Sequence, residues 1–184
     1  MCAATKQGDP SLTVYLDSSI FLAWLKDENR PNNEMDGVYE CFERMRKGEI
    51  QAIVSALIHT EVEVSRYSTE RQAEFYKLFT MENPLQVEPT LRVCEVAGEL
   101  RWFYLAEHEK TGQAKLETPD AIHLATAICH DAHEFYAFDK KVENKRLSVL
   151  DLSGSVGGRY SLVIRKPPVT TPLLDLKKKG SDAE

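Results

Sequence analysis

Short apolar runs alternate along this chain with longer stretches in which apolar residues recur at helical spacing. Residues 12–16 (LTVYL) form the first run, and a polar cluster, Asp17 to Ser19, separates it from the helical sequence IFLAWL. A run of strand-forming residues that stops at a turn predicts a buried strand, and Asp or Ser there suits the N-cap of the next helix. By the same pattern we predict strands at 12–16, 50–54, 85–88 and 135–138, and helices at 20–25, 35–47, 55–65, 69–79, 90–110 and from an N-cap at Thr118 through AIHLATAICH.

Strands and helices alternate from residue 12 to about residue 152. This order favours a central parallel sheet with helices on both faces, an α/β/α sandwich. The length of 184 residues also suits one domain. We therefore predict a loose lead-in at 1–11, one domain at 12–152, and a C-terminal extension with a polar tail at 153–184. The last strand of the domain is expected at 147–152. Within the extension we expect a flexible connector at 153–158 and one further strand candidate at 160–164.

Four acidic residues fall where a parallel sheet presents its binding edge. Asp17 and Asp139 directly follow two predicted strands, and Glu61 and Asp120 lie in helices that follow strands or loops. Because ligands of open parallel sheets bind beyond the carboxyl ends of the strands, all four are expected at one edge. Carboxylates brought together repel one another unless a divalent cation neutralises them, and hard oxygen ligands suit Mg²⁺ or Mn²⁺. Each acid by itself is an ordinary cap or a solvated residue, so this interpretation depends on their joint placement.

The overall charge argues against nucleic-acid binding over a broad surface. Lys and Arg number 23 against 29 Asp and Glu, which gives a net charge of −6. Affinity for phosphates normally comes from a basic surface, so a nucleic acid would have to be held through a metal or a local basic patch. Lys140 and Lys141, in the basic run after Asp139, are candidates for phosphate contacts, with an ordinary solvated face as the alternative.

The segments around the four acids resemble a known family. VYLDSSIFLAWL contains Asp17, HTEVEVSR contains Glu61, TPDAIHLATA contains Asp120, and FYAFDKKV contains Asp139. Together they are similar to PIN domains, in particular to the VapC-type ribonuclease toxins of prokaryotic toxin–antitoxin pairs. The resemblance covers roughly residues 12–152, and TPDAIHLATA is its most specific segment.

This resemblance implies a Mg²⁺- or Mn²⁺-dependent endoribonuclease on an α/β/α sandwich, usually a homodimer, with RNA as substrate and a cognate antitoxin as partner. The site would consist of the metal ligands Asp17, Asp120 and Asp139, of Glu61 as a ligand or as the group that orients the attacking water, and of Ser19 as support for the first Asp.

The chain departs from the family pattern near the last acid. Family members often carry Thr two positions before that Asp, where this chain has Ala137, which bears on the hydrogen bonding around Asp139. Glu63 takes the place of Glu61 if the helix register puts it in the site. His123, one turn after Asp120, is expected to be a packed residue rather than a substrate contact.

Other functions remain open from the sequence. A PIN-type nuclease of RNA processing or DNA metabolism would carry the same acids without an antitoxin. A catalytically weak PIN-like binding module is a third possibility, which Ala137 and the acidic net charge favour.

We expect no membrane span, because no apolar run is long enough, and no secretory signal. The four cysteines form no Cys-x-x-Cys pair and suit free thiols in a reducing cytoplasm.

Overall fold

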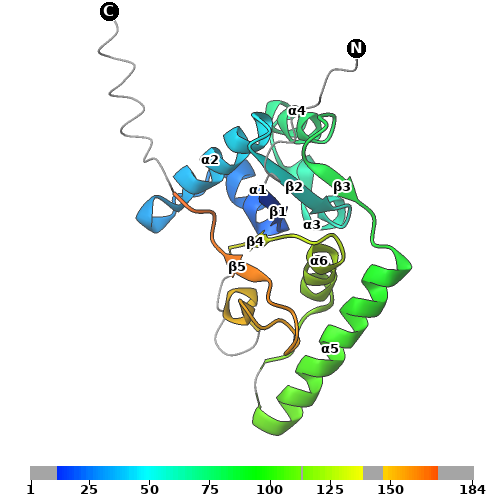
Figure 1. Ribbon diagram of the computed structural model, residues 1–184. Coiled ribbons are helices and arrows are strands. Elements are labelled where there is room, and N and C mark those ends of the chain that lie inside the picture. The colour runs from blue at the N-terminus through cyan, green and yellow to red at the C-terminus, as the bar shows by residue number, and fades with distance from the viewer. Residues whose placement is uncertain (1–11, 113, 139–146, 170–184) are drawn as a thin grey trace, which may run out of the picture.

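A parallel sheet lies between two layers of helices in the computed structural model, which describes residues 12–112, 114–138 and 147–169 (Figure 1). Its strands are β1 (Leu12–Leu16), β2 (Ile50–Ser55), β3 (Leu85–Val87), β4 (Glu134–Tyr136) and β5 (Val163–Arg165), in the order β3-β2-β1-β4-β5. The helices are α1 (Ser18–Leu25), α2 (Glu34–Arg46), α3 (Ile58–Glu61), α4 (Thr69–Leu78), α5 (Leu91–Thr111) and α6 (Thr118–Cys129). The predicted α/β/α sandwich is confirmed.

The central strand β1 separates two hydrophobic cores. Val14 and Leu16 point to the core that α1, α2 and α4 cover, whereas Tyr15 points to the core that α5 and α6 cover. All three side chains are fully buried. Side chains of a strand alternate between faces, so a central strand in such a sandwich needs a continuous apolar run, which LTVYL supplies.

The strand order also fixes where a ligand can bind. From β1 the chain moves outward through β2 to β3, then returns to place β4 on the opposite side of β1. The carboxyl ends of β1 and β4 therefore border the point at which the connections change direction. In open parallel sheets that point leaves a crevice between the two outgoing loops.

The predicted helix at 55–65 is largely wrong. The chain instead extends β2 to Ser55, forms the single turn α3, and then a 3₁₀ turn at Val64–Arg66. Val62 between them has extended dihedral angles and is buried together with Val64 in the first core. An α-helix would direct residues two apart to different sides, so the burial of both selects the irregular path.

The predicted strand at 147–152 is also wrong. Val149–Leu152 is a 3₁₀ helix, and the edge of the sheet next to β4 is taken by β5. Leu147, Val149 and Leu152 all point into the second core, which a strand with alternating faces does not allow. The first part of the C-terminal extension thus adds a strand, within the candidate segment 160–164 and one residue beyond it.

The glycine-rich connector is a packed turn. Gly157 and Gly158 have positive φ angles, and the Gly157 N–H donates to the Tyr104 hydroxyl at 2.9 Å. Helix α6 begins one residue earlier than expected, since its N-cap is Glu117 rather than Thr118, and Thr118 is already helical. Outside the described residues lie the predicted lead-in at 1–11 and, from residue 170 on, the rest of the predicted C-terminal extension with its polar tail.

Candidate active site

Asp17 is the N-cap of α1 and lies directly at the end of β1. Its N–H donates to the carbonyl of Tyr136 at 3.0 Å, which ties the ends of β1 and β4 together. Its Oδ2 accepts hydrogen bonds from the Ser19 N–H at 3.0 Å and from the Ser19 hydroxyl at 2.5 Å. The same hydroxyl accepts from the N–H of Phe138 at 2.9 Å. Ser19 therefore joins the first acid to the backbone that leads out of β4, as support for Asp17 requires.

Glu61 is the acid of its segment that faces the interior. Its Oε2 lies 2.6 Å from Nε2 of His123, and its side chain is only 22% exposed. Glu63 instead forms an ion pair with Arg66 on the surface, and its side chain is 57% exposed. Of the two acids, Glu61 is therefore the one that contacts His123, and Glu63 lies on the surface.

His123 is connected to the sheet on its other side. Nδ1 of the ring lies 2.6 Å from the hydroxyl of Tyr15, and that hydroxyl accepts from the N–H of Ser55 at 3.3 Å. Tyr15 is fully buried, stacks on Phe135, and has its pKa raised well above the usual value, by burial first and then by the charge of Asp17. The phenol consequently stays neutral and serves as a fixed hydrogen-bonding group.

Asp120 lies in the first turn of α6, one turn before His123, and is half-buried. Burial of His123 lowers its pKa, but the hydrogen bond with Glu61 and then the charge of Asp17 raise it. The charges of Glu61 and Asp120 act in the same direction, and the resulting pKa lies above the ordinary value. Glu61 thus contacts the imidazole directly, and the charges of Asp17 and Asp120 act on it in the same direction.

Part of the predicted site falls outside the described residues. Asp139, Lys140 and Lys141 belong to the segment 139–146, of which the structure gives no description. The residue before it, Phe138, is buried, and Ala137 is buried with its N–H bonded to the carbonyl of Arg165 at 3.1 Å. The Ala137 methyl group lies in the second core. Since alanine has no polar side-chain atom, this position offers no hydrogen bond to Asp139, as the usual Thr would.

The donors present are oxygen donors of the kind that Mg²⁺ and Mn²⁺ prefer. Among the described residues, no three His, Cys, Asp or Glu side chains gather closely enough to hold a metal ion by themselves. Mg²⁺ in proteins commonly keeps several waters and takes only one or two carboxylates. Asp17 and Asp120 fit a site of that kind, to which the undescribed Asp139 would add.

Sequence reasoning missed the bonded chain from Tyr15 through His123 to Glu61. The spacing in TPDAIHLATA indicated that His123 and Asp120 share a helix face, and its expected burial is confirmed at 1% exposure. Its partners lie 108 and 62 residues away in the sequence, so no local pattern indicates them.

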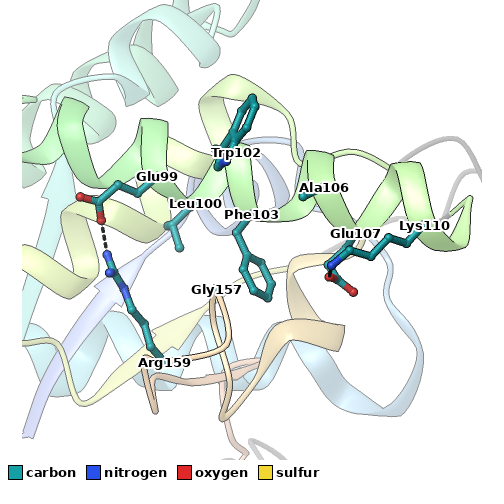
Figure 2. A pocket seen from close by; sticks show the side chains of 9 residues that line it. All are labelled: Glu99, Leu100, Trp102, Phe103, Ala106, Glu107, Lys110, Gly157 and Arg159. Atoms are coloured by element: carbon teal, nitrogen blue, oxygen red, sulfur yellow. Dashed lines mark hydrogen bonds and ion pairs between the residues drawn. The ribbon is translucent and has the colours of Figure 1, made fainter.

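A hollow lies between α5 and the turn that contains Gly157. Residues of α5, among them Trp102 and Phe103, form one wall, and Figure 2 shows Phe103 directed toward Gly157 and the Glu99–Arg159 ion pair joining the helix to the turn. Of the predicted acids that the structure describes, Asp17, Glu61 and Asp120, none lines this hollow. Trp102 is 73% exposed and is a surface residue of this wall rather than part of the core.

Fold and site together define an α/β protein with an acidic site at the carboxyl edge of a parallel sheet. The sequence profile of the PIN domain family matches residues 14–147, and the chain belongs to that family. No curated protein matches the sequence. Within the described residues, no helix combines the length and apolar character needed to cross a membrane.

Solved structures with a similar fold are distant in sequence. A chain of a toxin–antitoxin complex from Klebsiella pneumoniae is 19% identical, with a TM-score of 0.51 over 84% of this chain and 98% of that chain. A chain of VapBC2 from Rickettsia felis, bound to a DNA fragment from its promoter, is 18% identical with a TM-score of 0.49 over 74% and 97%. VapC20 of Mycobacterium tuberculosis, a toxin that cleaves the sarcin–ricin loop, is 15% identical with a TM-score of 0.48 over 70% and 91%. At this identity the likeness concerns the fold alone.

Proposed function

We propose that this protein is a divalent-metal-dependent endoribonuclease and the toxin of a toxin–antitoxin pair. The observation that carries the proposal is the placement of three acids by different elements of the fold. Asp17 caps α1 at the end of β1, Glu61 follows β2 and contacts His123 at 2.6 Å, and Asp120 lies one turn before that histidine at the start of α6. Carboxylates at the carboxyl edge of a parallel sheet suit a metal-dependent phosphodiester hydrolase.

In this proposal Asp17, Asp120 and Asp139 hold Mg²⁺ or Mn²⁺. A divalent cation bound there would stabilise the charge that develops on the phosphate during an in-line displacement. Ser19 keeps the Asp17 carboxylate in one orientation through its N–H and its hydroxyl. Glu61, with one oxygen held by His123, orients the attacking water or adds a ligand. The products are expected to carry 5′-phosphate and 3′-hydroxyl ends.

Substrate binding is assigned to the basic run after the last acid. Lys140 and Lys141 are proposed to contact RNA phosphates, which offsets the net charge of −6 next to the site. The acidic site in turn suits an antitoxin that places a basic side chain beside the carboxylates. A homodimer is part of the same proposal and is checked by sedimentation.

Free thiols support a reducing compartment, for which we propose the cytoplasm. Cys41, Cys94 and Cys129 form no disulfide in the described part of the chain. Cytosolic proteins keep their thiols reduced.

The test of activity is cleavage of an end-labelled RNA panel with Mg²⁺ or Mn²⁺. Wild type and Asp131→Asn should cut equally, whereas Asp120→Asn should lose cleavage by at least ~100-fold, the order of loss expected for an essential group. Asp131→Asn is a matched control, because it removes the same charge from an exposed residue just beyond the opposite end of α6. Cleavage that resists EDTA, or that Asp120→Asn retains, would refute the assignment.

The toxin assignment has its own test. A small protein encoded beside this gene should abolish the cleavage when it is added in equimolar amounts. Cleavage that no neighbouring gene product inhibits would favour a nuclease of RNA processing instead.

A further inference from the structure

Glu61 is held by a weak local element. Helix α3 is a single turn, and the residue that follows Glu61 already has extended dihedral angles. A helix that short is not stable on its own account, so local backbone structure cannot fix the direction of the carboxylate. The fixed direction has to come from a tertiary contact.

That contact is His123, which α6 carries. The ring is 1% exposed, its Nε2 lies 2.6 Å from Oε2 of Glu61, and its Nδ1 lies 2.6 Å from the Tyr15 hydroxyl. Tyr15 belongs to the central strand, and its hydroxyl already accepts the N–H of Ser55. The bonded series Ser55–Tyr15–His123–Glu61 therefore runs from β2 through β1 and α6 to the acid.

The hydrogen bonds determine which ring nitrogen carries a proton. With the Ser55 N–H as donor, the Tyr15 hydroxyl donates its own hydrogen to Nδ1, and Nε2–H then donates to the Glu61 carboxylate. A doubly protonated ring would likewise donate from Nε2. The remaining tautomer would direct a lone pair at the carboxylate, so the geometry requires a proton on Nε2 in either charge state.

We propose that His123 is a positioning residue that fixes the Glu61 carboxylate through Nε2–H, and that Tyr15 fixes the ring from the other side. The catalytic consequence rests on the proposed function, because it assumes that Glu61 acts on the scissile phosphate or its water. The hydrogen-bonding arrangement itself does not depend on that function.

A double-mutant cycle separates positioning from simple packing. His123→Leu should lower kcat for RNA cleavage by roughly 10- to 100-fold with little change in KM, as is usual when a group that orients a reactive side chain is removed. His123→Gln, whose amide N–H can reach Glu61 in place of Nε2–H, should recover most of the rate. In the Glu61→Gln background, His123→Leu should have no further effect, because both changes remove the same function.

Thr126→Val supplies the matched control. Thr126 is fully buried on the same helix, but its hydroxyl donates to the carbonyl of Ile122 within α6 and not to Glu61. It should lower stability without changing kcat. Equal losses of kcat in Thr126→Val and His123→Leu, or additive losses in the cycle, would overturn the positioning role.

The ring can also be followed without any substrate. Nitrogen-15 NMR of the metal-free protein should show His123 with a slowly exchanging proton on Nε2, and Tyr15→Phe should weaken its protection. A ring protonated only on Nδ1 would overturn the proposal whatever the activity. If wild type cleaves no RNA while the Nε2 proton is present, the ribonuclease assignment fails and the anchor of Glu61 is supported.

Discussion

Replacing Ser19 by Ala should be costly because its hydroxyl makes two hydrogen bonds at once. It donates to Oδ2 of Asp17 and accepts from the Phe138 N–H. Phe138 is 5% exposed, so the change leaves a buried N–H without its partner, a loss of about 1–3 kcal/mol. Asp17 keeps the Ser19 N–H, which limits the loss on that side. Because water can enter from the half-exposed Asp17 side, we expect a net loss near ~2 kcal/mol.

Ser18→Ala is the matched control for this change. Ser18 is the first residue of α1 and belongs to the same turn, but its side chain takes no part in these bonds. Alanine there should alter stability by no more than about 0.5 kcal/mol. Urea unfolding followed by circular dichroism measures both variants, and the slope m should be unchanged. At ~2–4 °C per kcal/mol for a chain of this size, Ser19→Ala should lower Tm by about 4–8 °C.

The same two variants also test whether Ser19 supports cleavage activity. Ser19→Ala should also reduce cleavage, since the Asp17 carboxylate loses one of two groups that hold it. If the two serine variants prove equally stable and equally active, then the bridge from Asp17 to the backbone after β4 has no energetic role and the reasoning is wrong.

Two further predictions concern glycines and thiols. Gly37→Ala should destabilise the protein by about 1–3 kcal/mol in urea unfolding, because a Cβ there would lie 2.5 Å from the carbonyl oxygen of Pro167. Gly98→Ala, in open space on α5, should instead stabilise it by up to ~1 kcal/mol through helix propensity; equal effects of the two changes would contradict the close approach. Burial raises the pKa of the Cys41 thiol to about 12, so at pH 8 iodoacetamide should label the exposed Cys94 and leave Cys41 unmodified until urea unfolds the chain. Mass spectrometry measures both sites, and labelling of Cys41 at the rate of Cys94 in the native protein would contradict its burial.

Local sequence pattern determined most of the elements and the positions of the acids. The apolar run at 12–16 predicted β1 with its exact bounds, and the polar residue after it predicted the N-cap that Asp17 provides. The Thr-Pro-Asp segment predicted the start of α6 within one residue. These features depend on neighbours in the chain: burial of consecutive side chains, a missing N–H at proline, and a carboxylate beside unpaired helix donors.

Tertiary structure decided the features that depend on distant neighbours. The sequence offered both 147–152 and 160–164 as strands, and only the pairing with the open edge of β4 selected the second as β5. The contact of Glu61, rather than Glu63, with His123 follows from the irregular path at 62–64, which burial of Val62 and Val64 in the first core imposes. The link from Tyr15 through His123 to Glu61 joins residues 62 and 108 positions apart. Sequence specifies which side chains are available, but only the packing of the sheet against α6 brings those three within hydrogen-bonding distance.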